Sequence, residues 1–561
     1  MKYLLTMLLL LPLTNNGTAA APSDDFATWF KGLEIRDDMT LTLPSGVHHI
    51  RADGLQRRYL HLSNNDDGEN TILFDLSGME NITIEGNGAE LVMHGYVIPF
   101  FMRKAKNIVI RNLTIDWANP FYAQGAVVDT GEDWFDVQFE SEYKLAVREG
   151  HLLAMNPDLP EPVQFHNLNF IDPQRGEQAF QSKDEYHALR PGNFRATDLG
   201  NGLVRLQSRH FRNRPQVGHV AVFQYEGRIS PAIAVQHSES IRIEKVTQYH
   251  TGAIANLFEG TRDISISNMR MTRRGNRWFS AQHDATHFVE CSGDITIENS
   301  LFEFQFDDGT NIHGIYRKIE RLVPENGIRL RLVHHQHLGA DTLRPGDVIA
   351  LLSRDELAVV HKATVSRVEW ISPELMDVYC DVPFPELDFE EFVVMNYITD
   401  VRVTIAGNRF QNNRARSLLI KTFGKIRIHD NYFHAPGPAI LISAGLSQWY
   451  ESGPVDDVAI YDNVFDQCNF GNWGEGVIAV TAMLANRASE YPVMPNIRIH
   501  DNQFIQIRQP LLKANNVANL EFYDNRILRG SDYPFRANTA GDFQFGPGVT
   551  TGKWQVEEAK E

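Results

Sequence analysis

The chain has 561 residues, of which 43% are apolar and 22% are charged. This balance is typical of a globular protein and excludes a disordered or collagen-like chain. The formal net charge of −18 argues against nucleic acid or an anionic membrane surface as a partner. The charge does not identify a substrate.

The first 21 residues have the pattern of a secretory signal peptide. Lys2 precedes an apolar run from Tyr3 to Leu13, and small residues follow at 18–21. A cationic residue, an apolar segment and a small-residue cleavage site in this order mark exported proteins. The run is too short to span a bilayer, and no later segment reaches the about 18 apolar residues that a span requires. We therefore expect residues 1–21 to be removed and the mature bacterial protein to be periplasmic or extracellular, with no membrane span.

Short alternating segments recur along most of the chain. Residues 425–433 (KIRIHDNYF), 458–465 (VAIYDNVF) and 497–504 (IRIHDNQF) share one template, and 264–268 and 295–299 fit its first half. Several neighbouring copies lie 23 residues apart, and the longer gaps fit the same unit with loop insertions. A period of about 20 to 50 residues with one short strand per repeat indicates a solenoid.

The alternation predicts how the repeats pack. Ile, Val and Phe fall on one face of each strand, and Arg, His, Glu and Tyr fall on the other. Strands of this kind stacked in parallel form a β-helix, in which each coil buries its apolar face against its neighbours. The Asn that ends each repeat suits a bend because it tolerates left-handed backbone, and stacked Asn side chains would bond one another along the axis. A leucine-rich repeat is the competing solenoid, but its Leu spacing is absent.

Two stretches, at 118–232 and 316–400, interrupt the repeats. Both contain longer alternating strands without the coil template, and residues 218–223 can be laid over 346–351. We expect two inserted antiparallel β-barrel-like modules, module 1 and module 2, that wall the binding face of an all-β parallel β-helix. The chain then divides into a signal peptide (1–21), an N-terminal cap with the first coils (22–117), module 1 (118–232), central coils (233–315), module 2 (316–400), C-terminal coils (401–535) and a C-terminal tail (536–561).

The three cysteines, Cys291, Cys380 and Cys468, are scattered along the chain. They lack the spacing of metal ligands, and nothing in the sequence pairs them. Buried free thiols are the simplest interpretation, so a large apolar core must hold the fold together.

Polar residues concentrate where the coils resume between the two modules. The block QHDATHF at 282–288 is followed by FDDGTNIHG at 306–314. Asp284 and Asp308 occupy the same place in these blocks, 24 residues apart, which is one coil. Because neighbouring β-helix rungs lie about 4.8 Å apart, Asp284 should be a stacked neighbour of Asp308 and of the adjacent Asp307.

Three carboxylates this close repel one another, so at least one should keep its proton near neutral pH. A protonated acid beside an ionised base is what glycosidic bond cleavage requires. Strand alternation would send the side chains of Asp307 and Asp308 apart unless the chain bends at Gly309. Turn capping by aspartate and calcium binding stay open as other roles. We favour catalysis because His, Gln and Asn flank the cluster and insertions wall it.

The two blocks resemble glycoside hydrolase family 110. The resemblance rests on Gln282 to His287 followed one coil later by residues 307–314. It implies an exported α-galactosidase that acts on terminal α-1,3-linked galactose, in blood-group-B-type or linear glycans, and that inverts the anomeric configuration without a cofactor or metal. It also implies a right-handed parallel β-helix with inserted β-barrel modules. The family's catalytic aspartates carry over onto Asp284, Asp307 and Asp308, and which is the acid and which the base stays open.

A sugar site also needs an aromatic platform for the ring face and polar groups for the hydroxyls. Trp278, six residues before Asp284, is the first platform candidate, and Trp449 comes next. For either tryptophan taken singly, ordinary packing is the more common role. The candidate hydroxyl-binding residues are Gln282, His283, His287, Asn311, His313, Arg416 and Glu451.

Three other classes of protein stay open. Polygalacturonases also place aspartates on β-helix rungs, but residues 311–314 replace their Gly-His-Gly. A uronate substrate would also require several cations, whereas the strand ends around Asp284 and Asp308 offer mostly neutral or acidic groups. A calcium-dependent polysaccharide lyase would need a strong base, for which Arg416 and Lys421 are the nearest candidates. A non-catalytic glycan-binding β-helix tends to lack a dense carboxylate cluster. The natural glycan and a homo-oligomeric state are also open.

Overall fold

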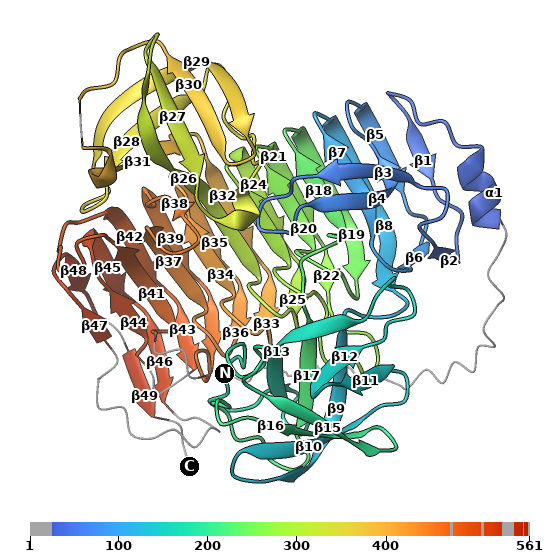
Figure 1. The fold of residues 1–561 in the computed structure, drawn as a ribbon. Coiled ribbons are helices and arrows are strands. Elements are labelled where there is room, and N and C mark those ends of the chain that lie inside the picture. Colours follow the sequence, from blue (N-terminus) through green and yellow to red (C-terminus); the bar gives the residue numbers. More distant parts are fainter. Residues whose placement is uncertain are drawn as a thin grey trace, which may run out of the picture.

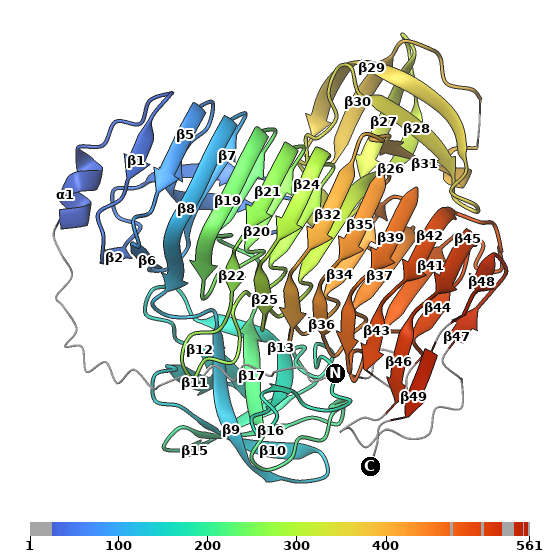
Figure 2. The same ribbon diagram turned by 180° about the vertical axis from the view of Figure 1, so that it is seen from behind.

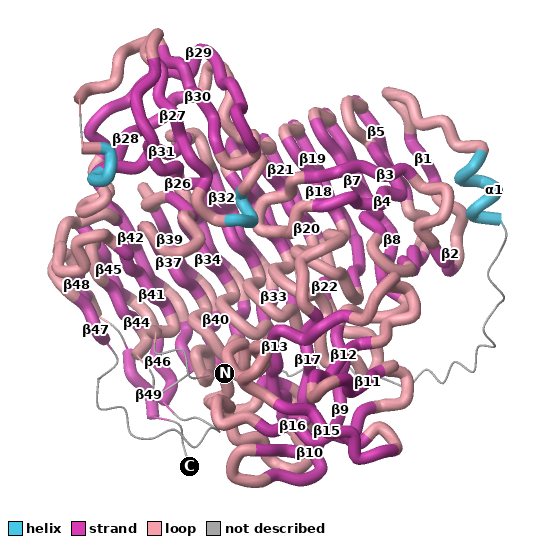
Figure 3. Tube along the Cα trace, in the orientation of Figure 1, coloured by secondary structure: helices cyan, strands magenta, loops and turns pink. Residues whose placement is uncertain are grey.

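The computed structural model describes residues 25–386, 388–471, 475–505, 510–529, 543–553 and 555–558. Strands dominate this part of the chain, and helix α1 (Asp25–Lys31) caps its N-terminal end (Figure 3). The expected signal peptide, residues 1–21, lies outside the described residues. Among the described residues, no helix has both the length and the apolar character needed to cross a membrane.

Most strands stack in parallel into a β-helix (Figures 1 and 2), as predicted. One coil shows the plan, because β23 (Thr286–Val289), β24 (Ser292–Glu298) and β25 (Leu301–Glu303) follow one another around it. We call the three columns of stacked strands row 1, row 2 and row 3. Their partners in the next coil are β26 (Thr310–Val323), β32 (Arg402–Ala406) and β33 (Arg409–Gln411).

The rows run the length of the molecule. Row 1 further contains β4 (Gly68–Asp75), β7 (Val97–Arg103), β18 (Ile233–Gln236), β20 (Asn256–Glu259), β34 (Leu418–Lys421), β37 (Ile440–Gly445), β41 (Ile478–Met483), β44 (Leu512–Ala514) and β47 (Phe543–Phe545). Row 2 further contains β1 (Thr40–Thr42), β5 (Glu80–Glu85), β8 (Lys106–Trp117), β19 (Glu239–Gln248), β21 (Arg262–Ser267), β35 (Lys425–His429), β39 (Asp457–Tyr461), β42 (Met494–His500), β45 (Val517–Tyr523) and β48 (Val549–Thr551). Row 3 further contains β2 (Val47–Ile50), β6 (Glu90–Met93), β22 (Arg270–Met271), β36 (Tyr432–His434), β40 (Val464–Asp466), β43 (Gln503–Ile505), β46 (Arg526–Arg529) and β49 (Gln555–Glu558).

The core lies along the axis of this stack. Phe302, Phe410, Phe433, Phe465 and Phe504 are fully buried, one per coil. The centroids of successive rings lie 5.1, 5.5, 5.1 and 4.8 Å apart, and the rings are nearly parallel. Each coil therefore covers the apolar face of its neighbour, which is how the solenoid excludes water.

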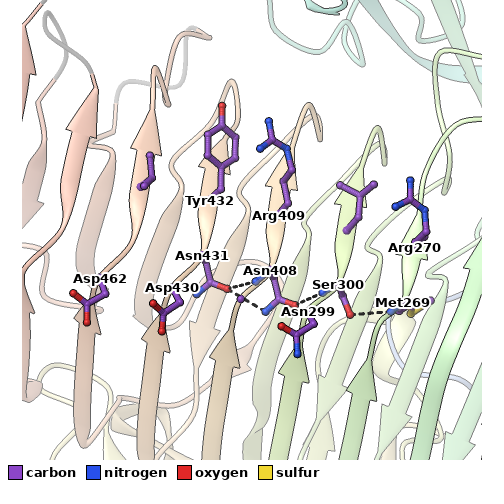
Figure 4. A pocket seen from close by; sticks show the side chains of 13 residues that line it. Met269, Arg270, Asn299, Ser300, Asn408, Arg409, Asp430, Asn431, Tyr432 and Asp462 are labelled. Carbon is purple, nitrogen blue, oxygen red and sulfur yellow. Dashed lines mark hydrogen bonds between the residues drawn. The ribbon is translucent and has the colours of Figure 1, made fainter. Parts of the chain in front are cut away.

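An asparagine ladder ties the same coils together beside the core (Figure 4). The backbone N–H groups of Asn408, Asn431 and Asn463 each donate to the Oδ1 of the Asn one coil further on, at 2.9–3.0 Å. The predicted stacking of Asn side chains is thus confirmed. The left-handed residue differs from our expectation, because in these coils it precedes the ladder Asn, as at Asp430 with φ 55°. In an earlier coil Asn299 itself is left-handed, with φ 52°.

The two modules are antiparallel sheets. Module 2 is closed, because its strands pair around in the order β26, β27 (Gly327–Leu332), β30 (Leu375–Cys380), β29 (Val359–Ser372), β28 (Val348–Ser353), β31 (Phe392–Asn396) and back to β26. Module 1 has the strand order β11 (Leu145–Arg148), β12 (His151–Ala154), β13 (Val163–Asp172), β17 (Val220–Tyr225), β9 (Tyr122–Thr130), β10 (Trp134–Phe139), β16 (Leu203–Gln207) and β15 (Arg195–Gly200), with β14 (Glu177–Gln178) beside β13. It curls toward closure, since the N–H of Ala196 donates to the carbonyl of Gly150. Both therefore have the barrel-like form that we predicted.

The insertion points place the modules on either side of row 1. The second half of β8 pairs with β6 and so continues from row 2 into row 3. Module 1 follows β8, where the chain turns from row 3 to row 1, and module 2 grows out of β26, where it turns from row 1 to row 2. The modules project from opposite edges of the stack (Figures 1 and 2). The outer face of row 1 therefore lies between them.

The C-terminal end differs from our expectation. We assigned residues 536–561 to a tail, but β47, β48 and β49 pair in parallel with β44, β45 and β46. The ring of Phe543 lies 5.2 Å from that of Phe522, which would otherwise form the open end of the core. The expected tail is therefore wrong for its described part, which forms a further coil. Cys291, Cys380 and Cys468 are buried free thiols.

Candidate active site

Asp284, Asp307 and Asp308 lie where the chain turns from row 3 into row 1. Thr286 of β23 pairs with Thr310 of β26, so the 24-residue offset read from the sequence is one coil. The N–H of Asp308 donates to Oδ1 of Asp284 at 3.0 Å. One carboxylate oxygen from each of the three aspartates lies within 4.8 Å of the others. The three side chains therefore form the single cluster that the repeat predicts.

Asp307 and Asp308 converge because the chain bends before it enters β26. Residues 306, 307 and 309 are bends rather than strand, so strand alternation does not apply to this pair. A Cβ on Gly309 would lie 2.6 Å from the carbonyl oxygen of Ser417 and 2.7 Å from the ring of Phe410. Only glycine permits this approach of neighbouring coils, which explains the glycine that follows Asp307 and Asp308.

Three arginines surround the cluster. Arg416 donates to Asp308 through its backbone N–H, at 2.9 Å, and through its guanidinium, at 2.5 Å. Arg414 donates to Oδ1 of Asp307 at 2.8 Å, and the guanidinium of Arg228 lies 3.9 Å from Oδ2 of Asp307. The expectation that this region offers mostly neutral or acidic groups is therefore wrong, and the shortage of cations is no argument against a uronate substrate.

Of these three arginines, only Arg416 was expected from the sequence; Arg228 and Arg414 were not. Arg414 lies two residues before Arg416 in the same coil, so the register that indicated Arg416 contained a signal for it. Arg228 lies at the end of module 1, outside every repeat, and had no such signal. Arg414 also donates to Asp184 of module 1, which the sequence analysis likewise missed.

The surroundings give the three carboxyls different proton affinities. Burial, strengthened by the negative charge of Asp307, raises the pKa of Asp284 to about 8. Burial also raises the pKa of Asp308 to about 7, although Arg416 opposes this. Burial would raise the pKa of Asp307 too, but the charges of Arg414, Arg416 and Arg228 outweigh it and hold that pKa below its usual value. Near neutral pH the cluster therefore contains protonated and ionised carboxyls side by side.

A chain of polar contacts leads away from the cluster along the outer face of row 1. Nδ1 of His287 lies 2.6 Å from Oδ2 of Asp284, and Nε2 of His287 lies 2.8 Å from Nε2 of His313. Glu451 follows, with Oε1 at 3.7 Å from Nε2 of His313 and Oε2 at 2.7 Å from Nζ of Lys421. Three of the predicted substrate-binding residues are thus buried in one network with the aspartates.

Short strand β38 (Glu451–Ser452) explains how Glu451 arrives there. It pairs antiparallel with the start of β26, which sets Glu451 opposite Ile315 and close to His313. Two residues that the sequence analysis missed complete this end of the network. Asn64 donates to Oε1 of Glu451 at 2.9 Å, and its own Oδ1 lies 3.2 Å from Nε2 of His337 in module 2.

Two groups of side chains have the geometry to reach one cation. They are the three aspartates, and His287 with His313 and Glu451. Cations of the protein already face both groups, because arginines bond Asp307 and Asp308, and Lys421 bonds Glu451. The same pairings place Arg416 and Lys421, the base candidates for a lyase, in ion pairs. The donor set therefore favours an ion-paired carboxyl site over a metal site.

Three predicted hydroxyl-binding residues carry buried polar atoms that the described part of the protein leaves without a hydrogen-bond partner. They are Oε1 of Gln282, Nε2 of His283 and Oδ1 of Asn311. Such atoms are uncommon in native structures, since each costs free energy unless a ligand or water satisfies it. Each of these three residues therefore keeps an unsatisfied hydrogen-bonding atom at a buried position.

The two predicted platforms have different surroundings. The ring of Trp449 is half-buried, 4.1 Å from the ring of His334 and 5.2 Å from the guanidinium of Arg228, so it lies beside the network. Trp278 instead packs among residues between module 1 and the coils, and the guanidinium of Arg273 covers its ring at 4.1 Å. The structure therefore does not support Trp278 as a sugar platform.

Comparison with known proteins places the chain in a family. The model of the GLAA-B beta-barrel domain II matches residues 327–387, inside module 2. An exopolygalacturonase from Thermotoga maritima aligns over 92% of this chain and 84% of its own, with 10% identity and a TM-score of 0.37, too low to bear on function.

Proteins related in sequence align with most of the chain. An enzyme named alpha-1,3-galactosidase A from Shewanella woodyi is 30% identical over 89% of this chain and 81% of its own length. An alpha-1,3-galactosidase B from Bacteroides thetaiotaomicron is 28% identical over 88% of this chain and 81% of its own length. The alignments span the coils and both modules, so the resemblance seen in the two aspartate blocks extends over most of the chain. The chain belongs to glycoside hydrolase family 110, the family of the α-1,3-galactosidases.

Proposed function

We propose that this protein is an exported glycoside hydrolase that removes terminal α-1,3-linked galactose from glycans by an inverting mechanism. Family membership supports the galactosidase activity and the class of substrate. Blood-group-B-type and linear α-galactosyl glycans are the candidate substrates. The inverting mechanism is inferred from the family resemblance, and the export is inferred from residues 1–21.

The carboxyl cluster is the observation that carries the catalytic role. Hydrolysis of a glycoside requires one carboxyl to protonate the leaving oxygen and another to activate water. Asp284, Asp307 and Asp308 supply both protonation states within one buried cluster. The guanidiniums of Arg228 and Arg414 hold Asp307 ionised, whereas Asp284 has no arginine among its hydrogen-bond partners in the described residues. This asymmetry supports an acid and base division of labour within the cluster.

The surroundings support recognition of an uncharged sugar. The cations next to the aspartates are already paired with carboxylates of the protein, as in the contacts of Arg416 with Asp308 and of Arg414 with Asp184 and Asp307. The unpartnered polar atoms of Gln282, His283 and Asn311 are the kind of group that binds hydroxyls. Trp449, from the loop after β37, offers an aromatic surface for the next sugar unit or for the ring face.

Inversion is inferred from the family resemblance rather than from spacing. The nearest oxygens of the three carboxyls lie within 4.8 Å of one another. Inverting glycosidases typically separate their two carboxyls by about 6.5–9.5 Å, so this spacing does not by itself favour inversion. Proton NMR of the first galactose released decides the matter, because an initial β-anomer means inversion and an initial α-anomer means retention.

The substrate class is tested with a panel of α- and β-linked nitrophenyl glycosides, an α-1,3-galactosyl disaccharide and galacturonan. We expect release from α-galactosides and from the α-1,3-linked disaccharide. Release only from galacturonan would establish the polygalacturonase alternative. This alternative is tested because the three arginines near the aspartates are cations of the kind that a uronate substrate requires. Binding of the disaccharide without release of galactose would indicate a non-catalytic glycan-binding protein.

Export is tested separately. The full chain and a chain lacking residues 1–21 are expressed in a Gram-negative host, and the protein is followed in the cytoplasmic, periplasmic and medium fractions. We expect only the full chain to leave the cytoplasm and to lose its N-terminal segment. Retention of the full chain at its complete mass in the cytoplasm would contradict the proposed export.

A further inference from the structure

The two histidines beside Asp284 form a hydrogen-bond chain with a fixed starting point. Nδ1 of His313 lies 2.7 Å from the carbonyl oxygen of Gly314. A carbonyl oxygen can only accept a hydrogen bond, so Nδ1 of His313 carries the hydrogen. In a neutral imidazole the other nitrogen, Nε2, is then an acceptor.

The next contact fixes the form of His287. Its Nε2 faces Nε2 of His313 at 2.8 Å, and two lone pairs cannot face each other at that distance. Nε2 of His287 must therefore donate, which makes its Nδ1 an acceptor while the ring is neutral. Burial lowers the pKa of both His287 and His313 to about 4, which favours neutral rings at neutral pH.

The last contact transfers this constraint to Asp284. Nδ1 of His287 lies 2.6 Å from Oδ2 of Asp284. With an accepting Nδ1, the hydrogen in this contact must come from the carboxyl group, so Asp284 is protonated. With His287 and His313 both neutral, the donor and acceptor roles thus place the hydrogen on Asp284, in agreement with the raised pKa that burial gives this carboxyl.

A metal ion is another way to reconcile two facing nitrogens. Zinc held by two imidazoles at about 2.0–2.1 Å in tetrahedral geometry would set the nitrogens about 3.3 Å apart, further than the 2.8 Å observed. The third ligand would be Glu451, whose carboxylate already bonds Lys421 at 2.7 Å and Asn64 at 2.9 Å. The contacts fit a hydrogen better than an ion.

Charged groups from several elements face this chain of contacts. The negative charge of Asp307 favours a proton on Asp284, while Arg228 and Arg416 oppose it. Near His313, the charge of Glu451 is offset by Lys421. The titratable and charged groups concerned are Asp307 and Asp308 before β26, Arg228 at the end of module 1, Arg416 and Lys421 before and on β34, Glu451 on β38, and His337 of the short helix η1 (His335–His337).

We propose that His287 and His313 are positioning residues that keep a proton on Asp284, through a directional hydrogen-bond relay anchored at the carbonyl of Gly314. The relay makes Asp284 the neutral carboxyl of the cluster in the resting protein and leaves Asp307 as its ionised carboxyl. The catalytic consequence of the relay rests on the proposed function, but the positions of its protons do not.

The relay is tested first without any substrate. In protein labelled with ¹⁵N-histidine, the ring nitrogen shifts distinguish the two neutral tautomers from the cation, and the signals are assigned by their loss in H287Q and H313Q. We expect His313 to be the Nδ1–H tautomer and His287 the Nε2–H tautomer near neutral pH. A cationic His287, a His287 with the hydrogen on Nδ1, or stoichiometric bound zinc by elemental analysis would overturn the proposal.

Two variants of His313 test the consequence. H313Q keeps an acceptor beside His287, whereas H313F removes it, so His287 is free to turn its hydrogen toward Asp284 and favour the ionised carboxylate. We expect the limb of the kcat/KM profile that reports Asp284 to move down by about one pH unit or more in H313F and to stay in place in H313Q. H500F, on the outer face of row 2, is the control and should leave the profile unchanged.

The outcomes separate the two proposals. Equal profiles for H313F and H313Q would contradict the relay even if the protein is an active galactosidase. The predicted tautomers in a protein that releases no galactose would support the relay and contradict the proposed function. Should H313F fail to fold, as judged by circular dichroism, the tautomers of the unmodified protein still decide the proposal.

Discussion

Replacing Arg416 with methionine tests the electrostatics of the carboxyl cluster most sharply. The guanidinium of Arg416 lies 2.5 Å from Oδ2 of Asp308, while its backbone N–H bonds Oδ1 and survives the substitution. An arginine next to an aspartate typically lowers the carboxyl pKa by about 1–3 units, because it favours the charged form. Burial and the negative charge of Asp307 raise the pKa of Asp308, and removal of the guanidinium takes away the main group that opposes them. We therefore expect its pKa to rise from about 7 to about 8–10.

The assay is the pH dependence of kcat/KM from about pH 4 to about pH 10. The limb of the profile that moves identifies the role of Asp308. If it must be ionised, the acid limb moves to higher pH; if it must be protonated, the alkaline limb does. The variant R416K keeps a positive charge near Asp308 and should shift the same limb less. A profile of R416M that matches the unmodified enzyme on both limbs would refute the electrostatic account of this site.

Three further predictions concern stability and binding. N463A should lower the free energy of unfolding by about 3 kcal/mol or more, because it leaves the buried ladder partners of Asn463 without a hydrogen bond, at about 1–3 kcal/mol each. An unfolding free energy, measured by urea denaturation, within about 0.5 kcal/mol of that of the unmodified protein would contradict this. Arg317 holds the pKa of buried Glu290 below 4.5, so this pair stabilises the fold at neutral pH and the stabilisation is lost as pH falls through the lowered pKa. R317L should lower the free energy of unfolding by about 3–5 kcal/mol and abolish the loss of stability at acid pH. An unchanged dependence of the unfolding free energy on pH would refute this prediction. W449A should raise KM about tenfold with little change in kcat, measured from initial rates, and an unchanged KM would exclude Trp449 from the binding surface.

The coil architecture was predictable from the sequence because its cause is local and repeated. Each coil needs the same alternation and the same bend, so the template around residues 425–433 reappears wherever a strand of row 2 stacks. The one-coil offset that brings Asp284 to Asp308 follows from the same period. Arg416 followed as well, since it occupies the equivalent place in the next coil once module 2 is removed.

The rest of the site could not be read in this way, because it comes from segments outside the repeat. Asn64, Asp184, Arg228 and His337 reach the site from an N-terminal loop and from the two modules. Their positions depend on how the modules fold back over row 1, which no local pattern encodes. Trp278 was chosen as a sugar platform for its proximity in sequence to Asp284. That proximity does not determine the direction of its ring, which Arg273 covers.

The most direct test of the central claim is the kcat/KM for an α-1,3-galactosyl disaccharide in D284N, D307N and D308N. Each variant keeps the shape of the side chain but cannot act as acid or base. The account predicts a loss of about 10²–10⁴-fold or more in all three. D430N, on an exposed left-handed bend that asparagine tolerates, is the matched control and should retain full activity. Near-normal activity in any one of the three variants would remove that aspartate from the reaction, and near-normal activity in all three would contradict the account.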